Sequence, residues 1–169
     1  MGLDIAEVGE LDRDAFVERF GGVFEASPWV ARAAYADGPF ADLNALHRAM
    51  LAIVSAAPRE RQIALIRAHP DLAGKAAIAG DLTPESTAEQ ASAGLDRLTP
   101  QQFARITDLN AAYRERFGFP FVICAREHDA AGIIEAMERR LANDPDSEVP
   151  IALEQIGRIA RLRLEDLVT

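Results

Sequence analysis

Apolar residues recur three and four positions apart along most of this chain, and this spacing limits the possible folds more than any other feature. After Asp42, for example, one face collects Leu43, Leu46, Met50, Ile53 and Val54. Such spacing places side chains on one side of an α-helix. The one stretch that could instead be extended is 119–123, where Pro120 disfavours a helical Phe119. The pattern therefore predicts an all-α protein.

Capping residues and helix breakers divide the periodic stretches into short helices. Thr99-Pro100 is typical of an N-cap followed by proline at the first helical position, and Gln102 stands where a capping box needs it. Ser27-Pro28 suggests the same kind of start. No linker of domain-boundary length interrupts the 169 residues. We therefore expect one domain over residues 1–169, a bundle of about eight helices with short connections.

The composition limits the classes of partner. A hydrophobic content of 49% is enough for a buried core, and a net charge of −9 disfavours nucleic acid and membrane surfaces as partners. The single cysteine, Cys124, excludes an internal disulfide and a cysteine-cluster metal site. We see no signal peptide and no apolar run near the ~18–20 residues of a membrane span. We expect a cytoplasmic protein without a metal site.

His69-Pro70 separates one helical pattern, which ends at Ala68, from another that starts at about Leu72. At such a break a side chain can point into a cavity, and histidine exchanges protons near neutral pH more readily than other residues. A single histidine before proline is, however, more often a surface turn or a satisfied buried group. A Cys124 nucleophile with His69 as its base stays open, although Val122 and Ile123 beside Cys124 favour an inert buried thiol.

Polar residues at 86–90 could border the same cavity. Ser86 and Gln90 lie four apart on one helical face, and Glu89 is one step off it. A first helical turn that faces solvent would produce the same pattern.

Residues 117–125 are mainly large and apolar, with Gly118 and Pro120 among them. Buried backbone outside a helix needs partners for its N–H and C=O groups, and a ligand with amide-like edges could supply them. A buried connection packed against helices is the alternative.

Two arginines lie in the predicted last helix. Arg161 and Arg163 could form surface salt bridges, but an inward-facing arginine would need an anionic partner such as a substrate carboxylate.

Three separated motifs resemble the family of 2-oxo-4-hydroxy-4-carboxy-5-ureidoimidazoline (OHCU) decarboxylases. They are Ala68-His69-Pro70-Asp71-Leu72, Ser86-Thr87-Ala88-Glu89-Gln90, and Phe117-Gly118-Phe119-Pro120-Phe121-Val122-Ile123. The resemblance extends over nearly the whole chain. It implies an all-helical homodimer that needs no cofactor and converts its small-molecule substrate, OHCU, into (S)-allantoin and CO2.

The resemblance also implies a set of site residues. The catalytic proton donor falls on His69, and we expect Glu89 to take part by accepting a hydrogen bond from the substrate hydroxyl. We assign the family's C-terminal substrate-binding arginine to Arg163 and not to Arg161, because Arg163 belongs to the closing Arg-Leu pair. The predicted substrate contacts are Pro70, Ser86, Thr87, Ala88, Glu89, Gln90, Phe121, Val122, Ile123, Cys124, Ala125 and Arg163.

Two other functions stay open at this point. One is a helical binding module that docks a partner on Phe119-Pro120-Phe121. The other is a hydrolase of a related ureido compound, with Glu89 activating water.

Overall fold

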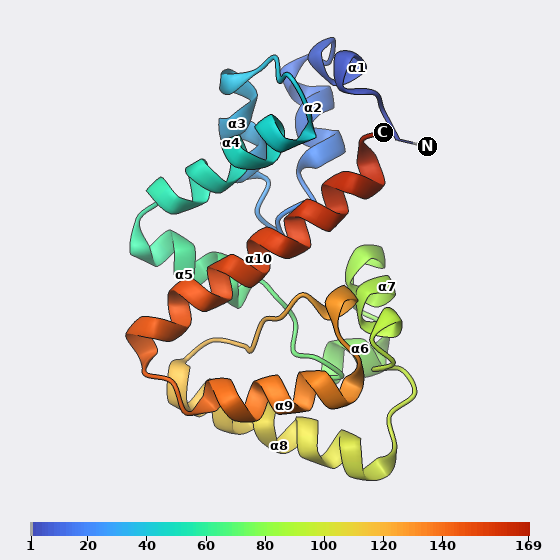
Figure 1. Ribbon diagram of the computed structural model, residues 1–169, viewed down its shortest axis with the longest axis vertical. Helices are drawn as coiled ribbons and strands as arrows, with labels where there is room; N and C mark the ends of the chain where they lie inside the picture. Colours follow the sequence, from blue (N-terminus) through green and yellow to red (C-terminus); the bar gives the residue numbers. More distant parts are fainter. Residues whose placement is uncertain (1) are drawn as a thin grey trace. The chain divides into compact units, whose positions relative to one another are not determined.

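The computed structural model describes residues 2–169, and in this range it contains ten α-helices, two 3₁₀ helices and no β-strand (Figure 1). An isolated bridge joins Leu3 to Val168. The predicted all-α class is confirmed. Tertiary contacts divide the chain into two compact units. Unit 1 runs to Ala68 and resumes at Gly157–Thr169, and unit 2 is His69–Ile156. The expectation of one domain over 1–169 stays a prediction.

Unit 1 is a set of short helices around an aromatic core. Its helices are α1 (Ile5–Gly9), α2 (Arg13–Phe20), α3 (Trp29–Ala34), η1 (Tyr35–Asp37), α4 (Leu43–Ala56), α5 (Arg59–Arg67) and the last part of α10 (Pro145–Leu167). The ring of Phe16 lies 4.9 Å from that of Phe20 and 5.5 Å from that of Tyr35, between centroids. These contacts join α2 to η1 and bury the apolar face of α2.

The start of α3 differs from the sequence prediction by one residue. Pro28 is the N-cap and not the first helical residue, and no side chain caps the helix. The Ser27 hydroxyl donates instead to the carbonyl of Glu25 at 2.8 Å. This hydrogen bond closes a turn that carries Glu25 into the interior of unit 1.

Unit 2 is built on two long helices that pack side by side (Figure 1). They are α8 (Pro100–Phe117) and α9 (Ala130–Leu141). The other elements are α6 (Lys75–Ala79), α7 (Pro84–Ser92), η2 (Ala125–Glu127) and the first part of α10. The capping box of α8 is present, with Thr99 and Gln102 exchanging backbone-to-side-chain hydrogen bonds of 3.1 Å each. Gly118, at φ 76°, ends α8 and starts the non-helical segment that leads to η2.

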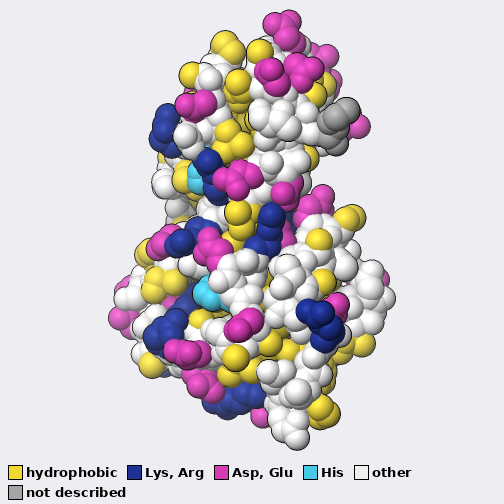
Figure 2. Space-filling model, turned by 45° about the vertical axis from the view of Figure 1, so that its right-hand side comes forward, with side chains coloured by type: hydrophobic (Ala, Val, Ile, Leu, Met, Phe, Trp, Pro, Cys, Tyr) yellow, Lys and Arg dark blue, Asp and Glu magenta, His cyan; other side chains and the backbone are white. Residues whose placement is uncertain are grey.

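Charge is unevenly spread over the surface. Figure 2 shows acidic side chains gathered at the end of unit 1 that carries α1, where Asp4, Glu7 and Glu10 are exposed. Among residues 2–169, no helix combines the length and the apolar character that crossing a bilayer requires.

Candidate active site

The turn that follows His69 is fixed from two helices of unit 2. The side chain of Gln90, on α7, accepts a hydrogen bond from the N–H of Ala73 at 2.9 Å. The amide of Asn110, on α8, donates to the carbonyl of Leu72 at 2.9 Å. Ala73 has φ 48°, a left-handed conformation that costs a non-glycine residue about 1–3 kcal/mol. The hydrogen bonds to α7 and α8 hold this strained turn in place.

His69 and its neighbours stand at the beginning of this turn. His69 is only 7% exposed, directly after the C-cap residue of α5, Ala68. Pro70 is half-buried. Arg114 on α8 forms an ion pair with Asp71, with 3.0 Å between Nε and Oδ1. The helix break predicted at His69-Pro70 is confirmed, and the histidine faces the interior.

One face of α7 is buried and the other is exposed. Ser86 and Gln90 are 4% and 7% exposed, whereas Thr87 and Ala88 lie at the surface and Glu89 is half-buried. The Thr83 hydroxyl caps the helix by accepting from the N–H of Ser86 at 3.2 Å. The buried face is the one that carries Ser86 and Gln90, so a wholly solvent-facing turn is excluded. The predicted substrate contacts of Thr87 and Ala88 stay predictions.

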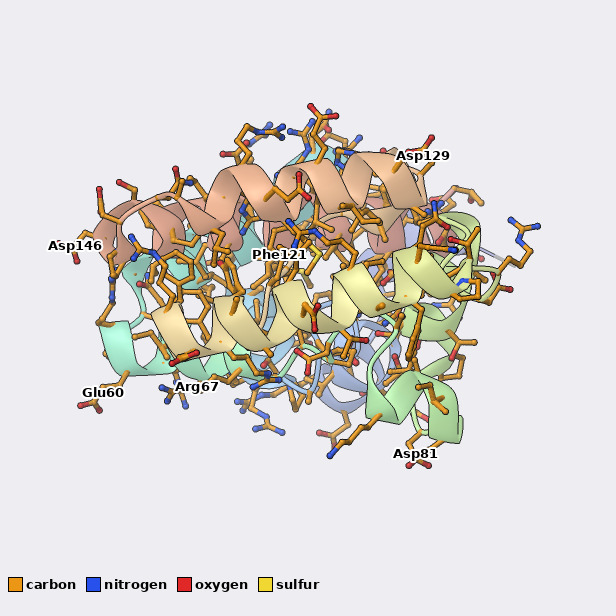
Figure 3. All side chains as sticks on the ribbon, turned by 90° about the horizontal axis from the view of Figure 1, so that it is seen from below. Glu60, Arg67, Asp81, Phe121, Asp129 and Asp146 are labelled. Atoms are coloured by element: carbon orange, nitrogen blue, oxygen red, sulfur yellow. The ribbon has the colours of Figure 1, made fainter. Side chains whose placement is uncertain are left out.

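Residues 121–125 form a buried, largely non-helical segment between α8 and η2. Phe121 lies between α8 and α9 (Figure 3), with its ring edge-on to Tyr113 and the Arg140 guanidinium 4.3 Å from its centroid. Arg140 donates to the carbonyl of Val122 at 2.7 Å. The N–H of Cys124 donates to the side chain of Gln155 at 3.1 Å. The segment is therefore held by side chains rather than by a sheet.

A buried polar cluster supports Arg140. Glu148 is fully buried and accepts from the Tyr113 hydroxyl at 2.6 Å, from Arg140 Nε at 2.6 Å and from Asn143 at 3.0 Å. Burial, and then the hydrogen bond to Glu148, raise the pKa of Tyr113 well above its ordinary value. The cluster ties α8, α9 and α10 to the 121–125 segment.

Contacts within unit 2 bring three of the four predicted patterns together. Gln90 joins α7 to the turn after His69, and α7 packs against η2, which begins at Ala125. The His69-Pro70 break, the 86–90 helix face and the end of the 121–125 segment therefore adjoin one another around α7.

The fourth pattern, Arg163, lies in unit 1. It is 4% exposed and pairs with Glu25, which is 6% exposed, at 2.9 Å between Nη1 and Oε2. It also donates to the carbonyl of Gly22 at 3.0 Å. Arg161 instead pairs with Glu165 at the surface, at 2.7 Å. Arg163 is thus the inward-facing arginine of the two, its anionic partner here is Glu25, and its contact with substrate stays a prediction.

A cavity of about 590 Å³ lies on another side of α7. Thr87, Ala91 and Gln90 line it from this helix, together with Ala73 and the exposed Ile78 and Phe103. His69, Ser86 and the 121–125 segment are not in its lining. This cavity therefore shares Gln90 and Ala73 with the cluster around His69 but does not include His69 itself. In the part of the chain that the structure describes, no group of three or more metal-binding side chains is assembled.

Sequence reasoning missed the residues that hold the site in place. Asn110, Arg114, Arg140 and Gln155 all bind backbone or side chains of the predicted motifs. Only Asn110 carried a signal, since it falls among the apolar positions Ile106, Leu109 and Tyr113 of its helix. A polar residue on an apolar stripe indicates a buried hydrogen bond.

Comparisons with known proteins identify the family of this chain. A family model described as OHCU decarboxylase matches residues 9–165. The 2-oxo-4-hydroxy-4-carboxy-5-ureidoimidazoline decarboxylase of Haloferax volcanii is 43% identical over 97% of this chain and 95% of its own length. The enzyme of the same name from Mus musculus is 42% identical, over 98% of this chain and 93% of its own length. A crystal structure of (S)-allantoin synthase superposes with a TM-score of 0.81 at 27% identity, covering 99% of this chain, which spans about half (54%) of that chain. The chain belongs to the OHCU decarboxylase family.

Proposed function

We propose that this protein decarboxylates OHCU to (S)-allantoin and CO2 without a cofactor, with His69 as the proton donor. The observation that carries the proposal is the convergence around α7 of a buried histidine break, a half-buried glutamate and a non-helical backbone segment. The relatives from Haloferax volcanii and Mus musculus are named as OHCU decarboxylases, and this chain aligns with them over nearly its full length.

The decarboxylation of OHCU requires few catalytic groups from the protein. The substrate carboxylate leaves a ring carbon next to a conjugated C=N bond, so the electron pair released with CO2 spreads into the substrate itself. Neither pyridoxal phosphate nor a metal ion has to accept it. What the protein must do is orient the carboxylate, stabilise the delocalised anion and deliver a proton to one face of the ring.

Each task falls to named residues of unit 2. Backbone groups of 121–125, with Ser86 and Gln90, hold the ring and its carbonyls. Glu89 accepts a hydrogen bond from the substrate hydroxyl, and its charge lies against the departing carboxylate. His69 gives its proton to one face of the ring carbon that becomes the stereocentre of allantoin. General acid help of this kind contributes roughly 10²–10⁴ in rate.

The molecular setting is also part of the proposal. We propose that the protein acts as a homodimer, as the family resemblance implies, and works in the cytoplasm. A single buried cysteine in 169 residues is what a reducing compartment favours.

The decisive experiment generates OHCU in situ from urate and follows the circular dichroism of the allantoin formed. Uncatalysed decay gives racemic allantoin, so the protein should accelerate the reaction and give the S enantiomer alone, with one CO2 trapped per turnover. Release of ammonia or a ureido acid without CO2 would mean a hydrolase. A racemic product at the uncatalysed rate would mean a binding module, and either outcome overturns the proposal.

A further inference from the structure

The segment that we expect to bind substrate owes its geometry to residues outside every predicted motif. We propose that Arg140 and Gln155 are positioning residues that aim the backbone N–H and C=O of Ile123 at a ligand with an acceptor and a donor side by side. A ureido or lactam edge has this arrangement. The inference rests on the proposed function and names how part of the substrate is held.

Arg140 fixes the direction of the Ile123 N–H. Its Nη1 donates to the carbonyl of Val122 at 2.7 Å. That carbonyl and the N–H of Ile123 belong to one planar trans peptide, in which they point to opposite sides. Holding the carbonyl toward Arg140 on α9 therefore directs the Ile123 N–H away from that side chain.

Gln155 fixes the direction of the Ile123 carbonyl in the same way. Its side-chain oxygen accepts from the N–H of Cys124 at 3.1 Å. The carbonyl of Ile123 stands on the other side of this peptide and points away from Gln155. Both polar groups of one residue are thus oriented by partners on α9 and α10.

Ile123 itself has the character of a binding residue. It is 6% exposed, and neither its N–H nor its C=O makes a hydrogen bond within residues 2–169. Buried backbone groups are normally paired, so a donor and an acceptor on one buried residue are suited to a ligand. Two residues further on, η2 begins and packs against α7, which carries Ser86, Glu89 and Gln90.

The position of Arg140 is itself enforced. Its Nε donates to the fully buried Glu148 at 2.6 Å, and its guanidinium lies over the ring of Phe121. A lysine cannot bind the carboxylate and the carbonyl with the same fork, because only arginine offers several donors in one plane. The contacts with Glu148 and Phe121 therefore hold the Arg140 guanidinium where it can bind the Val122 carbonyl.

The first test uses Gln155, which is only partly buried and so can be changed with less risk to folding. Gln155→Leu removes the acceptor of the Cys124 N–H, whereas Gln155→Glu keeps one. We expect Gln155→Leu to raise KM for OHCU about tenfold with kcat within about twofold, the signature of lost binding. Gln155→Glu should bring KM back to within about threefold of the wild type.

The second test separates positioning from stability at Arg140. Arg140→Met alone leaves Glu148 charged and buried, so the double variant Arg140→Met/Glu148→Gln removes both charges. We expect both variants to have a raised KM for OHCU. The single variant should also have a lower unfolding midpoint, which the double variant should recover. Arg105→Met is the matched control, because Arg105 also joins α8 to α9, through Glu138 at 2.8 Å, but at the surface. It should leave KM unchanged.

The outcomes distinguish this inference from the proposed function. If the wild type does not turn over OHCU, the proposed function fails. If the wild type is active and Gln155→Leu keeps the wild-type KM, the inference is overturned whatever the Arg140 variants do. A raised KM in Arg105→Met would likewise overturn it, because any loosened helix pair would then weaken binding.

Discussion

Removing the charge of Glu25 should destabilise the protein much more than removing an exposed carboxylate. Glu25 and Arg163 are 6% and 4% exposed and lie 2.9 Å apart, so each neutralises a charge that water does not reach. Breaking a buried pair from one side costs about 3–5 kcal/mol. Because Glu25→Gln keeps one acceptor oxygen, we expect a loss of unfolding free energy at the lower end of this range, about 3 kcal/mol. In a protein of this size each kcal/mol lowers Tm by about 2–4 °C, so Tm should fall by about 6–12 °C.

The assay is thermal unfolding followed by far-UV circular dichroism at neutral pH. Glu165→Gln is the matched control, because its arginine partner, Arg161, lies on the same helix but at the surface. Exposed pairs of this kind contribute about 0.3–0.5 kcal/mol, so the control should lower Tm by less than ~2 °C. The double variant Glu25→Gln/Arg163→Met should recover most of the loss, since it leaves no buried charge. Equal shifts for Glu25→Gln and Glu165→Gln would refute the reasoning.

The same variants test the predicted substrate contact of Arg163. Glu25→Gln keeps the arginine, whereas the double variant loses it in a protein whose stability has been restored. If Arg163 binds substrate, KM for OHCU should rise only in the double variant, by about tenfold or more for a charged hydrogen bond. An unchanged KM in both would leave Arg163 with a purely structural role beside Glu25 and Gly22.

Three further outcomes are expected. His69→Asn should lower kcat by roughly 10²–10⁴ while the protein stays folded, and a near-normal rate would remove His69 from the mechanism. Glu89→Gln keeps shape and removes charge, so it should lower kcat more than it raises KM, and an unchanged kcat would argue for simple positioning. Because burial and the hydrogen bond to Glu148 raise the pKa of Tyr113, folded protein keeps this proton when the unfolded chain loses it, and stability should fall by about 1.4 kcal/mol per pH unit above about pH 10. Tyr113→Phe should lack this decline in denaturant titrations between about pH 9 and 11, and an identical decline would assign it to other groups.

Sequence reasoning succeeded where local chemistry decides the structure. The capping box predicted at Thr99 and Gln102 is present, and the Thr99 hydroxyl accepts the hydrogen bond that such a residue favours. The break at His69-Pro70 follows from the restriction that proline places on the preceding residue. These features depend on a few neighbouring residues, so a single sequence is enough to reveal them.

Sequence reasoning overlooked one helix start near the beginning of the chain. Asp4 and Glu7 form a capping box that starts the short helix α1. The same pair motif was used to predict the start of α8, so the signal was present in the sequence and was overlooked.

The buried charges of Arg140 and Glu148 could not be predicted, because packing and not the local pattern decides which of these charged residues turns inward. Arg139 and Arg140 are neighbours on α9, with side chains 66% and 8% exposed. Glu148 follows Asp144, Asp146 and Ser147 in what looks like a solvent-facing start of a helix, yet its side chain is fully buried. The placement of the 121–125 segment accounts for the buried Arg140, since the buried carbonyl of Val122 requires a donor and Arg140 reaches it from α9. The motif that suggests a binding segment and the charges that orient it are thus far apart in the sequence, and the former cannot work as proposed without the latter.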